Sequence, residues 1–92
     1  MRVESVEVLS DQTNRIVLRH PGRAFPGVLL QGDSLYDLCT RADRACREVG
    51  RGSPGYGEVN ELRNILWAYL TDYKVTLGEH DVQLPFDEVP LH

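Results

Sequence analysis

The spacing of the apolar residues changes once along this chain, near Asp33, and that change constrains the fold more than any other feature. Before Asp33 the apolar residues fall in short, β-rich runs that are separated by turn formers. After Asp33 they recur every three or four residues, which is the spacing of amphipathic helices. A chain with strands first and helices afterwards is typical of an α+β fold.

Three runs before Asp33 predict strands, at about residues 2–10, 15–20 and 28–31. Turn formers at residues 11–14 join the first two runs into a hairpin. Two Pro-Gly turns lie between the second and third runs. We therefore expect a three-stranded antiparallel sheet, made of a hairpin plus a third strand.

The hairpin register follows from its apolar residues. Pairing Val8 with Ile16 and Val6 with Leu18 collects them on one face, whereas a slip of one residue would mix the two faces. The polar face would carry a row of arginines at residues 15, 19 and 23. Acidic residues at 4, 7 and 11 lie close enough to pair with that row, so cross-strand ion pairs are favoured over a basic binding stripe.

Two helices are predicted at about residues 34–49 and 58–77, and we expect them to cover one face of the sheet. Ser34 and Asp37 have the spacing of a capping box, and Gly50 and Gly78 follow the last apolar residues as C-terminal caps do. The predicted core residues of the first helix are Leu35, Leu38, Cys39, Ala42, Cys46 and Val49. Those of the second are Val59, Leu62, Leu66, Tyr69, Leu70, Tyr73 and Leu77, with Ile65 at the margin.

The order is thus βββαα, with a single domain over residues 1–78 and an acidic, Pro-containing, extended tail over residues 79–92. The tail carries four acidic residues and no Lys or Arg, which equals the chain's whole net charge of −4. It also carries Val82, Leu84, Phe86, Val89 and Leu91. We expect it to pack on the sheet edge or the second helix, with an added strand at residues 81–84, or to dock on a partner.

Five residues are candidates for binding a partner. An exposed Trp67 would anchor an interface, although contact with the sheet edge or the tail is the alternative favoured here. The others belong to the tail, where acidic groups flank one aromatic ring: Asp81, Phe86, Asp87 and Glu88.

No residue pattern predicts catalysis, a cofactor or a metal. Cys39 and Cys46 lie seven residues apart on one helix, too far for a disulfide, and are expected to be buried and reduced. The three histidines are scattered, and Ser34 lacks the flanking glycines of a nucleophile elbow. Residues 50–57 are Gly-rich but lack the Lys-Ser/Thr end of a phosphate loop, so a flexible helix connection is favoured.

Charge and hydropathy narrow the partners. An acidic chain is a poor binder of nucleic acid, and its longest apolar-rich stretch, residues 65–70, is too short to cross a membrane. The charged N-terminus does not resemble a signal peptide, so we expect the cytoplasm. A protein partner is expected, and a homo-oligomer stays open.

The run of residues 21–35, PGRAFPGVLLQGDSL, resembles the signature of an uncharacterised family of small bacterial proteins that is known only as a domain of unknown function. The resemblance extends from about Val3 to Leu77 and brings no catalytic residues. In size and build such proteins are similar to immunity-type inhibitors, by analogy of class alone. Two functions follow as expectations: an inhibitor that neutralises a toxin or another enzyme, or an accessory subunit or adaptor of a larger bacterial assembly such as a defence system.

Overall fold

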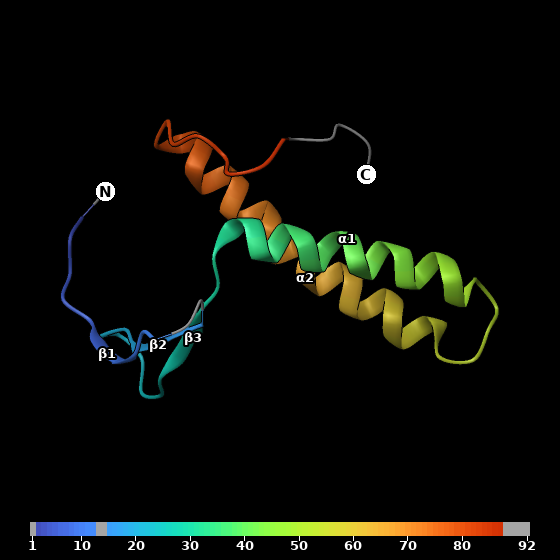
Figure 1. The fold of residues 1–92 in the computed structure, drawn as a ribbon, viewed down its shortest axis with the longest axis horizontal. Coiled ribbons are helices and arrows are strands. Elements are labelled where there is room, and N and C mark those ends of the chain that lie inside the picture. The colour runs from blue at the N-terminus through green and yellow to red at the C-terminus, as the bar shows by residue number, and fades with distance from the viewer. Residues whose placement is uncertain (1, 13–14, 88–92) are drawn as a thin grey trace. The chain divides into compact units, whose positions relative to one another are not determined.

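The computed structural model describes residues 2–12 and 15–87, which form two compact units, Met1–Gln31 and Gly32–His92 (Figure 1). The first unit holds three strands and the second holds two helices. The predicted order βββαα and the antiparallel sheet are confirmed. Residues 13 and 14 of the predicted turn, and residues 88–92 of the predicted tail, lie outside the described part of the chain.

The sheet consists of β1 (Glu7–Ser10), β2 (Ile16–Arg19) and β3 (Gly27–Leu29), in the order β1-β2-β3. All three strands are shorter than predicted. Two Pro-Gly steps, at residues 21–22 and 26–27, confine pairing because proline has no N–H to give to a ladder and glycine favours turns.

The predicted hairpin register is wrong by two residues. Val8 pairs with Leu18 rather than with Ile16, and an irregularity between Val8 and Ser10 leaves one extra residue on β1. A slip of two preserves which face each side chain occupies, so the apolar pattern could not separate the two registers. The observed register places Glu7 opposite Arg19, and their side chains form an ion pair at 3.4 Å.

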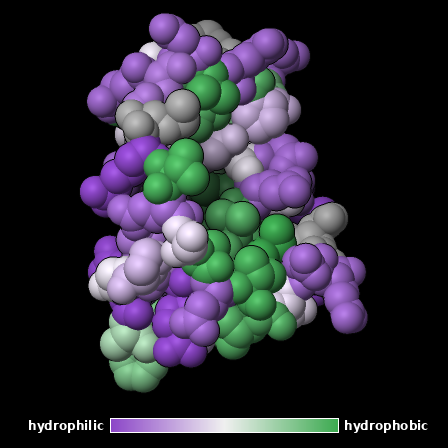
Figure 2. Space-filling model, turned by 90° about the vertical axis from the view of Figure 1, so that its left-hand side faces the viewer, coloured by the Kyte–Doolittle hydropathy of each residue, from purple (hydrophilic) through white to green (hydrophobic). Residues whose placement is uncertain are grey.

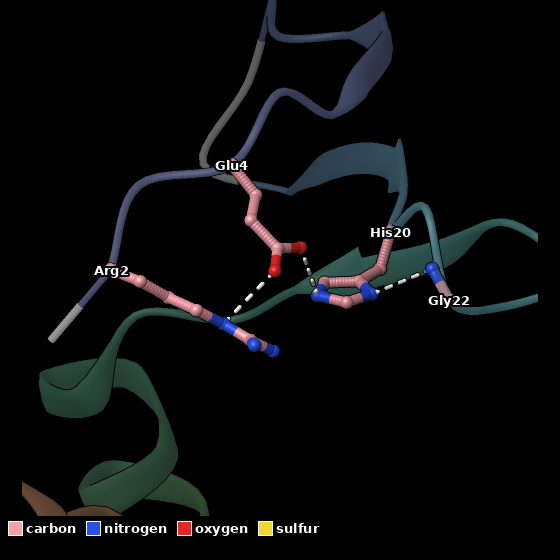
Figure 3. A network of polar contacts seen from close by, with 4 residues as sticks. All are labelled: Arg2, Glu4, His20 and Gly22. Atoms are coloured by element: carbon pink, nitrogen blue, oxygen red, sulfur yellow. Dashed lines mark hydrogen bonds and ion pairs between the residues drawn. The ribbon is translucent and has the colours of Figure 1, made fainter.

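A second polar network precedes the sheet in sequence and closes on the turn after β2 (Figure 3). The Glu4 carboxylate accepts from Arg2 Nε at 2.9 Å and lies 3.6 Å from His20 Nε2. The other ring nitrogen of His20, Nδ1, accepts a hydrogen bond from the Gly22 N–H at 3.0 Å. Because Nδ1 accepts this bond, Nε2 is the ring nitrogen that faces the Glu4 carboxylate.

The second unit is an antiparallel helical hairpin of α1 (Gly32–Val49) and α2 (Tyr56–Glu79), shown side by side in Figure 1. Its innermost residues are Leu35, Cys39 and Leu70, with Ala42 and Cys46 also buried. Both cysteines are free thiols, as predicted. Five larger side chains pack around the innermost residues: Tyr36, Leu66, Trp67, Tyr73 and Phe86.

The predicted capping box is wrong, because α1 begins two residues before Ser34. Its first residue, Gly32, is buried, and a Cβ there would run into the ring of Tyr73. The Asp37 carboxylate accepts a hydrogen bond from Arg41 Nε at 2.8 Å, one turn further along the helix. The close packing of Gly32 against Tyr73 is a long-range contact, which a local capping pattern cannot report.

The end of α2 is also corrected. Gly78 does not stop the helix; the residue in left-handed backbone is Asp81, with φ 55°. The Val82 N–H bonds to the Leu77 carbonyl at 2.9 Å, and the Asp81 N–H bonds to the Gly78 carbonyl at 3.4 Å. This pair of bonds is a Schellman motif, in which glycine usually takes the left-handed position and aspartate can replace it.

Three residues of the predicted core stripes are exposed: Leu38, Leu62 and Tyr69. The helical period was right, but the contact face of α2 is narrower than the apolar residues suggest. Leu66, Leu70 and Tyr73 face α1, whereas Leu62, Ile65 and Tyr69 lie outside the contact. One partner helix can bury only one stripe of a helix that is apolar on two sides.

Candidate functional site

Trp67 joins the two helices. Its indole Nε1 donates a hydrogen bond to Asp43 Oδ1 at 3.0 Å, and its half-buried ring packs against the core. This hydrogen bond joins Trp67 to α1, and the predicted contact with the sheet edge or the tail stays a prediction. An indole that supplies a buried ring and a satisfied N–H at a helix–helix contact has a structural role in the hairpin.

Phe86 brings the tail into contact with the same helical hairpin. Its ring stacks on Tyr36, with ring centroids 4.4 Å apart and an interplanar angle of 7°. Tyr36 and Asp43 are seven residues apart on α1, two turns along one face, so Phe86 and Trp67 contact the same side of that helix. The described part of the tail thus packs in cis on the helical hairpin, against Tyr36 of α1 and a core cluster that includes Leu70 of α2.

The remaining tail candidates do not come together with these two rings. Asp81 is exposed and turns the chain at the end of α2, and Asp87 is exposed one residue after Phe86. Glu88 lies outside the described residues. The strand predicted at residues 81–84 is wrong, because those residues form a turn followed by irregular backbone.

The side of the hairpin away from Trp67 carries a set of large apolar residues that we call the apolar face. At about 100° per residue, Leu62, Ile65 and Tyr69 lie roughly 140–160° around α2 from Trp67. Leu38 lies about 140° around α1 from Asp43. Because the Trp67–Asp43 bond marks one side of the antiparallel pair, these four residues share the other side.

The apolar face is exposed along its whole length. The exposed fractions are 40% for Leu38, 55% for Leu62, 46% for Ile65 and 60% for Tyr69. Contiguous exposed apolar side chains on a small protein mark interaction surfaces more often than isolated ones do. The sequence contained a signal for this face. The apolar stripe of the second helix, with Ile65 at its margin, is wider than one helix–helix contact can bury.

The buried thiol of Cys39 is not a nucleophile at neutral pH. Its side chain is fully buried, and desolvation, together with the nearby charge of Asp43, raises its pKa from 9.0 to about 11. A thiol reacts as its thiolate, so Cys39 belongs to the core rather than to a site.

Within residues 2–12 and 15–87, no group of three or more His, Cys, Asp or Glu side chains is placed to hold a metal ion. In the same part of the chain, neither helix is long and apolar enough to cross a membrane.

Comparison with known proteins identifies a family and no characterised relative. Residues 1–86 match the model of a family described as "Family of unknown function (DUF6959)". Neither the curated proteins nor the solved structures include a significant match. The match covers nearly all of the chain, so the protein belongs to this family of unknown function.

Proposed function

We propose that this member of a family of unknown function is a small, non-catalytic bacterial binding protein, and that it acts as an immunity-type inhibitor of a toxin or another enzyme. The observation that carries the proposal is the apolar face of the hairpin. Four large side chains from two helices present a ready-made helical surface, and such a surface fits a groove on a protein partner.

Charge supports an enzyme as the partner. The chain has a net charge of −4, and its tail places the exposed carboxylates of Asp81 and Asp87 near the hairpin. Complementary charge speeds association with basic clefts, which many nucleic-acid-cleaving enzymes contain. In this proposal the apolar face supplies most of the affinity and the acidic groups supply the rate of association.

An accessory subunit or adaptor is the second candidate. It is favoured by apolar side chains exposed on the sheet unit, where Val8 and Leu29 flank β2 on one face of the sheet. Figure 2 shows apolar side chains gathered in the lower half of the face that it draws. Two compact units with a surface each suit a protein that holds two components together.

Substitution of Ile65 by Asp tests the apolar face. A charge at the centre of a buried interface costs several kcal/mol, so we expect I65D to abolish capture of the partner from a lysate of the native host. Thr71→Asp is the matched control, because it adds the same charge at an exposed position of α2 on the side of Trp67. Capture that survives I65D, or that is lost equally in T71D, would exclude the apolar face.

Co-expression then separates the two candidate functions. If the captured protein stops growth when it is expressed alone, and wild-type chain but not I65D restores growth, the protein is an inhibitor. If the captured protein is harmless alone and co-purifies in a larger assembly, the adaptor function is correct.

A further inference from the structure

The closed end of the helical hairpin contains a cavity of about 490 Å³ that plays no part in the proposed protein interface. It lies between the last turn of α1, the connecting loop and the first turns of α2. Its lining residues are Cys46, Arg47, Gly50, Arg51, Tyr56 and Arg63. The volume is within the range of about 300–1,000 Å³ that is usual for small-molecule sites.

Three of the chain's ten basic residues line this cavity, although the protein as a whole is acidic. No carboxylate is among the lining residues. Among the described residues, neither Arg47 nor Arg51 has an ion-pair or hydrogen-bond partner. Arg63 donates only to the neutral amide oxygen of Asn60. The positive charge of the cavity is therefore not neutralised within it.

Ordinary structural roles account for only part of this arrangement. Arg47 lies in the last turn of α1, where a cation is favoured by the helix dipole. Arg51 follows the end of α1 by two residues and shares this effect, whereas Arg63 lies near the second turn of α2 and gains nothing from a helix C-terminus. Positive charges that surround one cavity repel one another unless an anion binds between them.

The loop leaves room for such an anion. Gly50, Gly52 and Gly55 have φ between 79° and 85°, a backbone conformation that residues other than glycine rarely adopt. Gly55 precedes α2 and gives it no side-chain cap. A Cβ at Gly52 or Gly55 would meet nothing within 4 Å, so the backbone here is open to an approaching ligand.

We propose that this cavity binds a small phosphate-bearing molecule, with Arg47, Arg51 and Arg63 as its anion ligands. Guanidinium groups match phosphate because their N–H groups form paired, charge-assisted hydrogen bonds with its oxygens. The ring of Tyr56, half-buried in the cavity wall, supplies an apolar and hydroxyl-bearing surface beside the phosphate position. Occupation would join α1, the loop and α2 through one ligand.

Titration of the full chain with inorganic phosphate and with AMP, followed by NMR at constant ionic strength in chloride, tests the proposal. We expect saturable shifts of the amides of residues 47–63 with both probes, and none with adenosine, which lacks the phosphate. R51A and R63Q should each raise the Kd about tenfold or more. R44A is the matched control, because Arg44 is exposed on α1 outside the cavity and should change the Kd less than about twofold.

Three results would overturn the proposal. The first is equal weakening by R44A and R51A, which would show only the general attraction of a basic surface. The second is equal binding of AMP and adenosine, which would show that phosphate is not recognised. The third is the absence of saturable shifts together with protection of the same amides by the captured protein partner, which would assign the arginines to carboxylates of that partner. The amide spectra of the variants establish that each is folded.

Discussion

At the residue scale, Gly32 and Tyr73 show how little space the hairpin leaves at the start of α1. The ring of Tyr73 occupies the position that a Cβ on residue 32 would need. Gly32→Ala must therefore push Tyr73 away from the core, and we expect it to lower the free energy of unfolding by about 1–3 kcal/mol. Urea denaturation followed by circular dichroism measures this loss.

Gly78→Ala is the control for that substitution. Gly78 also lies inside a helix, but a Cβ there meets nothing within 4 Å. This change should stabilise the protein by about 0.4–1 kcal/mol, because alanine loses less backbone entropy on folding. Equal effects of the two substitutions would show that Tyr73 does not constrain residue 32.

Cys39 gives the hairpin a predictable response to alkaline pH. Its pKa is raised from 9.0 to about 11 by burial first and by Asp43 second. The folded state therefore holds the thiol proton at pH values where the unfolded state has lost it. The resulting stability is fully present below about pH 9 and is lost as the pH rises through 11.

The predicted loss is on the order of 2 kcal/mol. It is measured as the difference in unfolding free energy between pH 8.5 and pH 11, in wild type and in Cys39→Ala. Every other ionisable group is the same in both proteins, so the difference between the two curves isolates Cys39. Parallel curves would contradict a buried, protonated thiol.

At the scale of elements, the described part of the tail contacts the helices through the stack of Phe86 on Tyr36. Phe86→Ala removes the stack on Tyr36 and uncovers part of the core cluster. We expect a loss of about 1–3 kcal/mol in unfolding free energy, because a ring is lost from a partly buried position and not from a closed core. Thermal denaturation measures the change.

Asp87→Ala serves as the control for Phe86, because Asp87 is the adjacent exposed residue and should change stability by less than about 0.5 kcal/mol. Truncation after Gly78 should destabilise the protein at least as much as Phe86→Ala does. If the truncated chain keeps its stability, the stack contributes nothing and the tail is an inert end.

The elements also show what a sequence can specify. The existence, type and order of all five were predictable, because apolar spacing differs between strands and helices. The hairpin register was not, since a two-residue slip keeps Val8 and Leu18 on the same face. The close contact between Gly32 and Tyr73 was not, since the two residues are distant in sequence.

For the whole molecule, the sequence pointed to the two aromatic residues that pack on the hairpin core, but it did not predict their contact partners. Trp67 and Phe86 were singled out, and both pack on the hairpin core through Asp43 and Tyr36. Such partners depend on how the two helices are aligned, which no local pattern contains. The three arginines of the cavity were missed for the same reason, although their position around a Gly-rich loop was a usable signal.

The acidic balance of the molecule hides a local excess of opposite sign. Four acidic residues of residues 75–92 account for the net charge of −4, and the arginine-lined cavity lies at the closed end of the hairpin, away from the helix end that leads into the tail. The acidic net charge argues against a nucleic-acid partner, but it says little about a ligand with one phosphate. The net charge of the chain therefore disfavours a large polyanion more firmly than it disfavours a small anion.

The seam between the helices has one consequence for optical spectroscopy. The single tryptophan and all four tyrosines belong to residues 32–92, and residues 1–31 contain neither. Because the indole sits against Asp43 of the facing helix, its emission should change when the hairpin opens and stay silent while the strands separate. Thermal unfolding followed by tryptophan fluorescence therefore reports on the helices alone. The difference between its midpoint temperature and the midpoint recorded on strand amides measures whether the two units unfold together.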